Sequence, residues 1–324
     1  AQRAFEHAQR EQLGLTSNEM ALLAKYFHPI ASLITLVYGV FWQLLKRTRQ
    51  TRIIGALDAG EEIDEDGGLV SAVKGDRHIW QEELAPGSLR YLVSLLLDTS
   101  GSMVDESEQD LSSGLLPIDY ASQGGVLLAE GIGPFREDQV DFEEYAFSDD
   151  AAVPLKPFGQ PYTPRTRVEI ISGMVHGEHG GTRGVEAVEA AIQRQAEREL
   201  PETRKLIIVV SDGKFHNTRL ASGEVVSGKE AMRRVMEANP DTGIWGIGIG
   251  PSAGDVADTF GEHGIVVPNP QGLPAALTDL LTREMNEASH RRPPMAPKLP
   301  RLTITALTVF AVVAVALWAW GALP

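Results

Sequence analysis

The chain has 324 residues, 43% of them hydrophobic, which is enough for one large α/β domain with extensions or for two small domains. Its formal net charge of −15 at pH 7 argues against a general nucleic-acid-binding protein, because such a protein needs a basic face to neutralise phosphates. Cysteine is absent, which excludes a disulfide framework, a thiolate nucleophile and a Cys-ligated zinc site.

Residues 1–52 are predicted to form a helical extension with a break at Gly14 and a helix start at Thr16 or Ser17. Within it, residues 27–45 are strongly apolar and are followed by the basic run KRTRQTR. Two interpretations stay open: a transmembrane helix stopped by cytoplasmic positive charges, or an amphipathic helix that packs on the domain or on a partner. We favour the packed helix because apolar residues recur at helical spacing, at Leu33, Leu36, Val40 and Leu44.

Residues 53–89 are expected to lead into the main domain, with an acidic stretch and short strand-like pieces. Residues 90–288 then alternate between apolar runs of strand length and helical stretches. The predicted strands are 91–98, 140–148, 205–212, 243–250 and 264–268. The predicted helices are 118–132, 184–199, 228–238, 254–261 and 273–287. Buried strands separated by helices indicate an α/β fold with a doubly wound, mostly parallel central sheet flanked by helices.

The last part of the sequence predicts a membrane anchor. Residues 289–301 are basic and Pro-rich, as in an extended linker. Residues 302–321 contain no charged side chain, and 20 helical residues span about 30 Å, the thickness of a bilayer core. The tryptophans Trp318 and Trp320 lie at the far end, where interfacial aromatics belong. The alternative, a C-terminal core helix, would normally show a polar stripe.

The charge bias around this segment predicts its orientation. Basic residues precede the apolar tail and none follows it, namely Arg291, Arg292, Lys298 and Arg301. By the positive-inside tendency, the 90–288 domain is expected in the cytoplasm, held at the membrane by a single C-terminal span.

Three motifs follow or flank the predicted strands and carry side chains suited to a metal ion. DTSGSM, which follows a buried strand, contains Asp98, Ser100 and Ser102. HGGTRG contains Thr182 before a helix, and VVSDG ends another buried strand at Asp212. In a parallel sheet these motifs should meet at one edge. Hydroxyl and carboxylate oxygens favour Mg²⁺, with Mn²⁺ or Ca²⁺ as alternatives, and such a set leaves coordination positions for water and an external carboxylate.

The order Asp-x-Ser-x-Ser, then Thr, then Asp resembles the metal-ion-dependent adhesion site of von Willebrand factor A (vWA) domains. The resemblance implies that Ser100, Ser102 and Thr182 coordinate or approach the metal, while Asp98 and Asp212 act through the serines and water. It implies a protein-interaction module that grips a partner's Asp or Glu, and no enzymatic activity of its own.

Residues 50–288 are similar, more narrowly, to the aerobic cobaltochelatase small subunit and the nitric oxide reductase activation protein. The similar segments are RIIGALDAGEEID, GGTRGVEAVEAA with the later SDG, and DTFGEHGIVVPNPQGLPAAL. That resemblance implies a MoxR- or chelatase-type AAA+ ATPase as partner, in metal insertion or complex maturation. The acidic insert 104–117, the segment 213–219 and the predicted anchor depart from the family pattern, so the class is carried over and no named role.

Two alternative functions follow from the same residues. One is a subunit of a cobalt or magnesium chelatase, although no tetrapyrrole pocket is marked in the sequence. The other is a Mg-dependent hydrolase whose base would be His176, His179 or His216; we favour a hydrogen-bonding or solvent-exposed role for these histidines. No GxxxxGK[ST] motif is present, so the chain is not itself a P-loop ATPase. The glycines of GIGIGPSAG are expected to serve tight packing of a strand.

Overall fold

The chain divides into residues 1–290 and 291–324 in the computed structural model. The structure describes residues 14–48, 52–57, 62–63, 80–84, 90–150, 152–177, 179–198, 203–219, 223–250 and 253–290. The predicted anchor 302–321 and most of the predicted linker 289–301 lie outside the described residues. The last helix of the domain continues to His290, so it includes the first two residues of the predicted linker.

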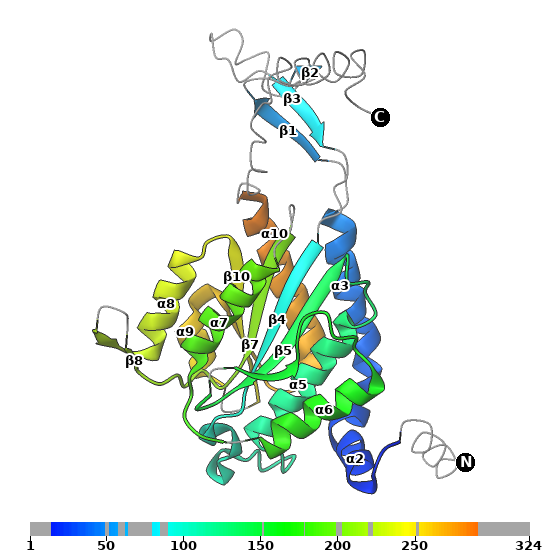
Figure 1. The fold of residues 1–324 in the computed structure, drawn as a ribbon, viewed down its shortest axis with the longest axis vertical. Helices are drawn as coiled ribbons and strands as arrows, with labels where there is room; N and C mark the ends of the chain where they lie inside the picture. The colour runs from blue at the N-terminus through cyan, green and yellow to red at the C-terminus, as the bar shows by residue number, and fades with distance from the viewer. Residues whose placement is uncertain are drawn as a thin grey trace, which may run out of the picture. The chain divides into compact units, whose positions relative to one another are not determined.

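A six-stranded sheet forms the centre of the domain, with strand order β11-β10-β7-β4-β5-β6 (Figure 1). Its strands are β4 (Arg90–Asp98), β5 (Val140–Phe147), β6 (Val153–Lys156), β7 (Thr203–Val210), β10 (Thr242–Ile249) and β11 (Gly264–Val267). The pairs β4 with β5, β4 with β7, β7 with β10 and β10 with β11 are parallel. Only β6 runs antiparallel, against β5. The predicted α/β fold with a mostly parallel sheet is therefore confirmed.

The strand order reverses at β4. The chain passes from β4 to β5 on one side and later returns to β7 on the other side. In open α/β sheets such a reversal leaves a crevice at the carboxyl ends of the strands, where loops diverge to opposite faces. In this sheet the reversal lies beyond the ends of β4 and β7, whose residues Leu97 and Val210 are paired.

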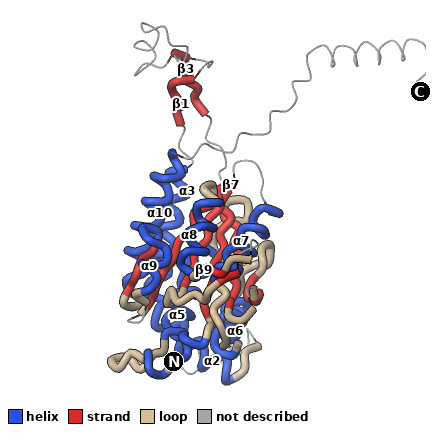
Figure 2. Tube along the Cα trace, turned by 90° about the vertical axis from the view of Figure 1, so that its left-hand side faces the viewer, coloured by secondary structure: helices blue, strands red, loops and turns tan. Residues whose placement is uncertain are grey.

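Helices cover both faces of the sheet (Figures 1 and 2). One face carries α3 (Ile34–Thr48), α5 (Pro117–Ile132), α6 (Pro164–His176) and α10 (Leu273–His290). The other carries α7 (Gly184–Glu197), α8 (Gly228–Ala238) and α9 (Asp255–Phe260). Strand alternation supplies both layers: Leu95 and Leu97 of β4 pack on the first side and Leu96 on the second.

The N-terminal helical segment packs on the domain. It consists of α2 (Ser17–Leu22), a π-helical turn η1 (Leu23–Phe27), a 3-10 segment η2 (His28–Leu33) and then α3. Thr16 caps α2: its Oγ1 accepts from the Glu19 amide at 3.3 Å, and its own amide donates to Glu19 Oε2 at 2.7 Å. Apolar residues before α2 and along η1, η2 and α3 are buried in the same core as α5 and α10: Leu15, Leu23, Tyr26, Ile30, Val37, Phe41 and Leu45.

Polar contacts and one close approach hold this helix in place. Tyr26 Oη donates to Asp119 Oδ1 at 2.6 Å, and Lys25 Nζ donates to the same oxygen at 2.8 Å. A Cβ at Gly131 of α5 would collide with Val37, so glycine at this position permits the contact between the helices. Among the described residues, Ser17–Gln43 is the stretch that by length and apolar composition could cross a membrane. The structure seats it against α5 and α10, as in the packed interpretation.

Two smaller sheets accompany the central one among the described residues. Strands β1 (Arg52–Leu57), β2 (Glu62–Ile63) and β3 (Trp80–Leu84) form a small sheet within the lead-in, in the order β1-β3-β2. Strands β8 (Thr218–Arg219) and β9 (Val225–Val226) pair as a short ribbon. The sequence analysis listed neither α6 nor β6. Helix α6 begins with two start signals that the sequence analysis did not use: the side chain of Thr163 accepts from the Thr166 amide, and Pro164 lies in the first turn.

Candidate metal-binding site

The carboxyl ends of β4 and β7 bring the two predicted acids together. Asp98 is the last residue of β4 and is fully buried, and Asp212 follows β7 and is 2% exposed. Ser211 connects them, because its hydroxyl donates to Asp98 Oδ2 at 2.6 Å and its own side chain accepts from the Gly213 amide at 2.9 Å. Two buried carboxylates therefore lie at the carboxyl ends of two neighbouring strands, where the strand order reverses.

The loop after β4 folds back on Asp98. The Ser100 amide donates to Asp98 Oδ1 at 2.8 Å, so both carboxylate oxygens of Asp98 accept a hydrogen bond. The hydroxyls of Ser100 and Ser102 lie 3.2 Å apart, and Ser100 is buried. This pair of oxygens sits where the backbone turns into the 3-10 segment η3 (Gly101–Val104). The two serines therefore present adjacent hydroxyls next to an oriented carboxylate.

Thr182 reaches the same edge on a third loop, just before α7. The Gly101 amide donates to the Gly180 carbonyl at 2.7 Å, which ties this loop to the serine loop. The His216 amide donates to the Thr182 carbonyl at 3.2 Å, and the Thr182 amide donates to His216 Nδ1 at 3.3 Å. Thr182 itself is buried. The structure thus collects all five predicted residues on three mutually bonded loops.

Burial controls the electrostatics of Asp98. The pKa of its carboxyl is raised to about 6, against an ordinary value of 3.8, chiefly because the group is removed from water and also because of the neighbouring charge of Asp212. Hydrogen bonds from Ser100 and Ser211 act in the opposite direction without cancelling the effect. Two buried acids side by side create a demand for positive charge.

The residues fit a divalent cation. Asp212 Oδ1 accepts from the Lys214 amide at 3.0 Å, whereas Asp212 Oδ2 is buried and has no hydrogen-bond partner within the described part of the chain. A buried carboxylate oxygen without a donor is costly unless a cation satisfies it. The donor set of hydroxyls and carboxylates is the hard, all-oxygen type that Mg²⁺ and Mn²⁺ take. No cluster of three or more His, Cys, Asp or Glu side chains that could hold a metal occurs among the described residues, so a zinc-type histidine site has no support there.

The structure shows supporting residues that the sequence analysis missed. Ser211 links Asp98 to the β7 loop, and Asp149 Oδ1, just after β5, accepts from the Gly181 amide at 2.6 Å. A Cβ at Gly180 or Gly181 would collide with Asp149, so the GG pair before Thr182 is needed for this contact. Their positions in the sequence could have identified them, because Ser211 and Asp149 both follow the ends of strands that neighbour β4.

Two of the three histidines near the site have identified hydrogen bonds. His179 Nδ1 lies 2.9 Å from the Thr99 carbonyl, and His216 Nδ1 accepts from the Thr182 amide. Both bonds connect neighbouring loops at the rim of the site. These histidines therefore help to position the loops.

The glycine-rich end of β10 has the packing role that the sequence predicted. A Cβ at Gly248 would collide with Ala253 and contact Val256, so glycine permits the close approach of these residues.

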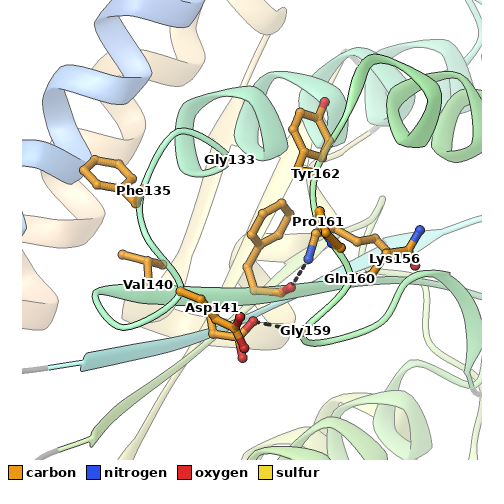
Figure 3. A pocket seen from close by; sticks show the side chains of 11 residues that line it. Gly133, Phe135, Val140, Asp141, Lys156, Gly159, Gln160, Pro161 and Tyr162 are labelled. Atoms are coloured by element: carbon orange, nitrogen blue, oxygen red, sulfur yellow. Dashed lines mark hydrogen bonds between the residues drawn. The ribbon is translucent and has the colours of Figure 1, made fainter.

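A separate pocket lies at the opposite ends of the strands (Figure 3). Its volume is about 280 Å³, and its wall includes Phe135, Asp141, Phe142, Lys156 and Tyr162. Lys156 Nζ donates to the Phe142 carbonyl at 2.5 Å, and the Gly159 amide donates to Asp141 Oδ1 at 3.3 Å. The Lys156 ammonium and the Asp141 carboxylate in its wall thus have partners inside the protein, and the pocket contains none of the five predicted metal ligands.

No family model matches the sequence, and no curated protein matches it. Solved structures do align with the chain. They include the PilB minor pilin from Streptococcus sanguinis, at 15% identity with 66% of each chain covered and a TM-score of 0.43. The manganese-loaded TRAP protein from Plasmodium vivax aligns at 15% identity over 60% of this chain and 74% of that chain, with a TM-score of 0.44. The SpRpn10 VWA domain aligns at 15% identity over 60% of this chain and 95% of that chain, with a TM-score of 0.36.

The chain spans less than two thirds of the pilin, 62% in one pilin structure and 66% in another.

Proposed function

We propose that this protein is a membrane-anchored interaction module of the vWA type, which binds a carboxylate of a protein partner through Mg²⁺. The metal would be held by Asp98, Ser100, Ser102, Thr182 and Asp212. When bound, the ion supplies a coordination position for an Asp or Glu side chain of the partner. The partner that we propose is a AAA+ ATPase of the MoxR or chelatase type, which the module would connect to a client in metal insertion or complex maturation.

The observation that carries this proposal is the Oδ2 atom of Asp212. It is buried at the strand-order reversal, beside the carboxylate of Asp98, and lacks a hydrogen-bond donor within the described residues. The loops that bring Ser100, Ser102 and Thr182 to the same edge are held by bonds between the loops. A site whose protein oxygens are oriented, and in which one buried carboxylate oxygen accepts no hydrogen bond, is suited to holding a cation.

Membrane attachment is proposed from the sequence alone. The segment 302–321 is uncharged and long enough to span a bilayer, and four basic residues precede it between residues 291 and 301. In this arrangement the 90–288 domain lies in the cytoplasm. That placement suits an ATP-dependent partner, since ATP is available there.

The proposal is tested by affinity purification of the full chain in mild detergent, once with Mg²⁺ and once with EDTA. We expect a AAA+ ATPase with Mg²⁺ and its loss with EDTA. Ser102→Ala should lose the partner as well, while circular dichroism shows an intact fold. Ser107→Ala is the matched control, because it removes an exposed hydroxyl five positions further along the same loop.

Two results would contradict the proposal in different ways. Equal recovery with Mg²⁺ and EDTA, or by Ser102→Ala and the parent chain, would show that binding does not use the metal. Recovery of a partner that is not an ATPase, still dependent on Mg²⁺, would keep the metal-dependent module and replace the AAA+ assignment.

A further inference from the structure

Lys214 occupies an unusual place beside the proposed metal site. Its Nζ atom lies 3.7 Å from Asp212 Oδ2, the oxygen without a hydrogen-bond donor, and 3.3 Å from Glu108 Oε1. The two carboxylates differ in setting, since the Asp212 side chain is 2% exposed and that of Glu108 is 35% exposed. A lysine ammonium therefore stands between a buried metal-site acid and a surface acid.

The backbone fixes this arrangement. Gly213 has a φ of +86°, a conformation that disfavours other residues, and a Cβ there would collide with the backbone of Asp255 and Val256. The Thr259 hydroxyl donates to the Gly213 carbonyl at 3.1 Å and ties the turn to α9. The turn leads Lys214 back over Asp212, whose Oδ1 accepts from the Lys214 amide.

Glu108 belongs to the acidic insert 104–117, in the short 3-10 turn η4 (Glu106–Glu108). The contact with Lys214 therefore joins this insert, which follows the serine loop, to the loop after β7. The insert and the segment 213–219 are also the parts of the sequence that depart from the family pattern noted above. The two departures meet in one ion pair at the edge of the site.

From this geometry we infer that Lys214 is an internal counter-cation, which competes with the divalent metal for Asp212 and joins the 104–117 insert to the rim of the metal-free site. Metal binding then requires the ammonium to leave Asp212 Oδ2. Because the Lys214 side chain is 39% exposed, it can swing into solvent without unfolding the loop. The inference rests on the proposed metal site and adds a regulatory residue to it.

The size of the effect follows from charge. In a water-like dielectric, a single positive charge about 5 Å from a divalent ion lowers the affinity of the site for that ion by about tenfold. When the lysine moves into solvent, this loss of affinity falls toward the small value that is typical of an exposed ion pair. We therefore expect Lys214→Met to bind Mn²⁺ about three- to tenfold more tightly than the parent chain. The gain should shrink as salt is added, because salt screens partly exposed charges.

The test is a Mn²⁺ titration of the full chain in detergent, with free ion counted by electron paramagnetic resonance. Lys205→Met is the matched control: Lys205 lies near the start of β7, at the opposite end of the strand from Asp212, about 20 Å away at 3.3 Å per residue. This control should leave the Mn²⁺ affinity unchanged. Asp98→Asn should abolish binding in both backgrounds and identifies the site that is titrated.

The outcomes separate the inference from the proposed function. Tighter, salt-sensitive binding by Lys214→Met alone supports the inference. Equal or weaker binding by Lys214→Met, with Asp98-dependent binding in the parent chain, overturns the role of Lys214 and leaves the metal site standing. Absence of Mn²⁺ binding in both the parent chain and Lys214→Met overturns the inference together with the proposed metal site.

Discussion

Glu144 offers a direct test of the packing in this fold. Strand alternation places it with Phe142 and Ala146 on the face of β5 that packs against α5 and α6, and its side chain is fully buried. A Cβ at Gly125 of α5 would lie 3.0 Å from Glu144 Oε1, so the carboxyl sits directly beneath that helix. Neither carboxyl oxygen has a hydrogen-bond partner among the described residues. Burial raises the pKa of Glu144 to about 8, although the charge of Lys156 acts in the opposite direction.

The sign of the effect on stability follows from this shift. The folded protein keeps a proton on Glu144 up to a pH of about 8, whereas the unfolded chain releases it near 4.5. Stability from this group is therefore complete below 4.5 and is lost as pH rises toward 8. The difference of 8 − 4.5 = 3.5 in pKa corresponds to about 5 kcal/mol over the whole range.

Glu144→Gln removes the titration while it keeps the shape of the side chain. We expect the two proteins to differ by no more than about 2 kcal/mol at acidic pH, from the changed hydrogen-bonding groups. The difference in unfolding free energy between Glu144→Gln and the parent chain should shift by about 4 kcal/mol in favour of the variant when the pH rises from about 5 to about 8. Urea denaturation followed by far-ultraviolet circular dichroism measures both values, and Glu106→Gln, at an exposed position, controls for the loss of one negative charge.

One result would refute this reasoning. If Glu144 were ionised and paired with Lys156, Glu144→Gln would strand a buried ammonium and would be the less stable protein at neutral pH. A difference in stability that does not change with pH would equally show that Glu144 does not titrate in the folded protein over this range.

Further predictions concern the helix packing, the metal and the membrane. Gly131→Ala should cost about 1–3 kcal/mol in urea denaturation, because its Cβ collides with Val37, and Val37→Ala should recover part of the loss; a neutral Gly131→Ala would mean that the helix does not dock there. Below a pH of about 6, the Mn²⁺ affinity should fall about tenfold per pH unit, since the raised pKa of Asp98 makes protons compete with the metal, and a flat profile would contradict this. Protease added to spheroplasts should spare residues 90–288 until the membrane is lysed, and earlier cleavage would reverse the topology. A chain ending at residue 290 should leave the membrane in alkaline carbonate, and its retention there would show that residues 27–45 span the bilayer.

Local patterns in the sequence were enough to predict the central sheet. Continuous apolar runs such as YLVSLLLD occur where a strand is buried on both faces, and β4 is buried along nearly its whole length. The predicted strand ends agree with the observed ends to within a few residues, and all five predicted helices are present. The order of the motifs also placed Asp98, Ser100, Ser102, Thr182 and Asp212 at one sheet edge, because the carboxyl ends of parallel strands share that edge.

Contacts between distant segments could be decided only by the tertiary structure. Antiparallel β6 is a short strand that is defined by its pairing with β5. The apolar N-terminal helix suits either a bilayer or a protein core, because both accept the same side chains; its packing depends on Gly131 and Asp119, about a hundred residues away. The ion pair of Lys214 with Glu108 and the isolation of Glu144 beneath Gly125 likewise depend on which loops and helices meet. Hydrophobic periodicity records how much of a residue is buried, whereas the identity of its neighbours is set only when the whole chain folds.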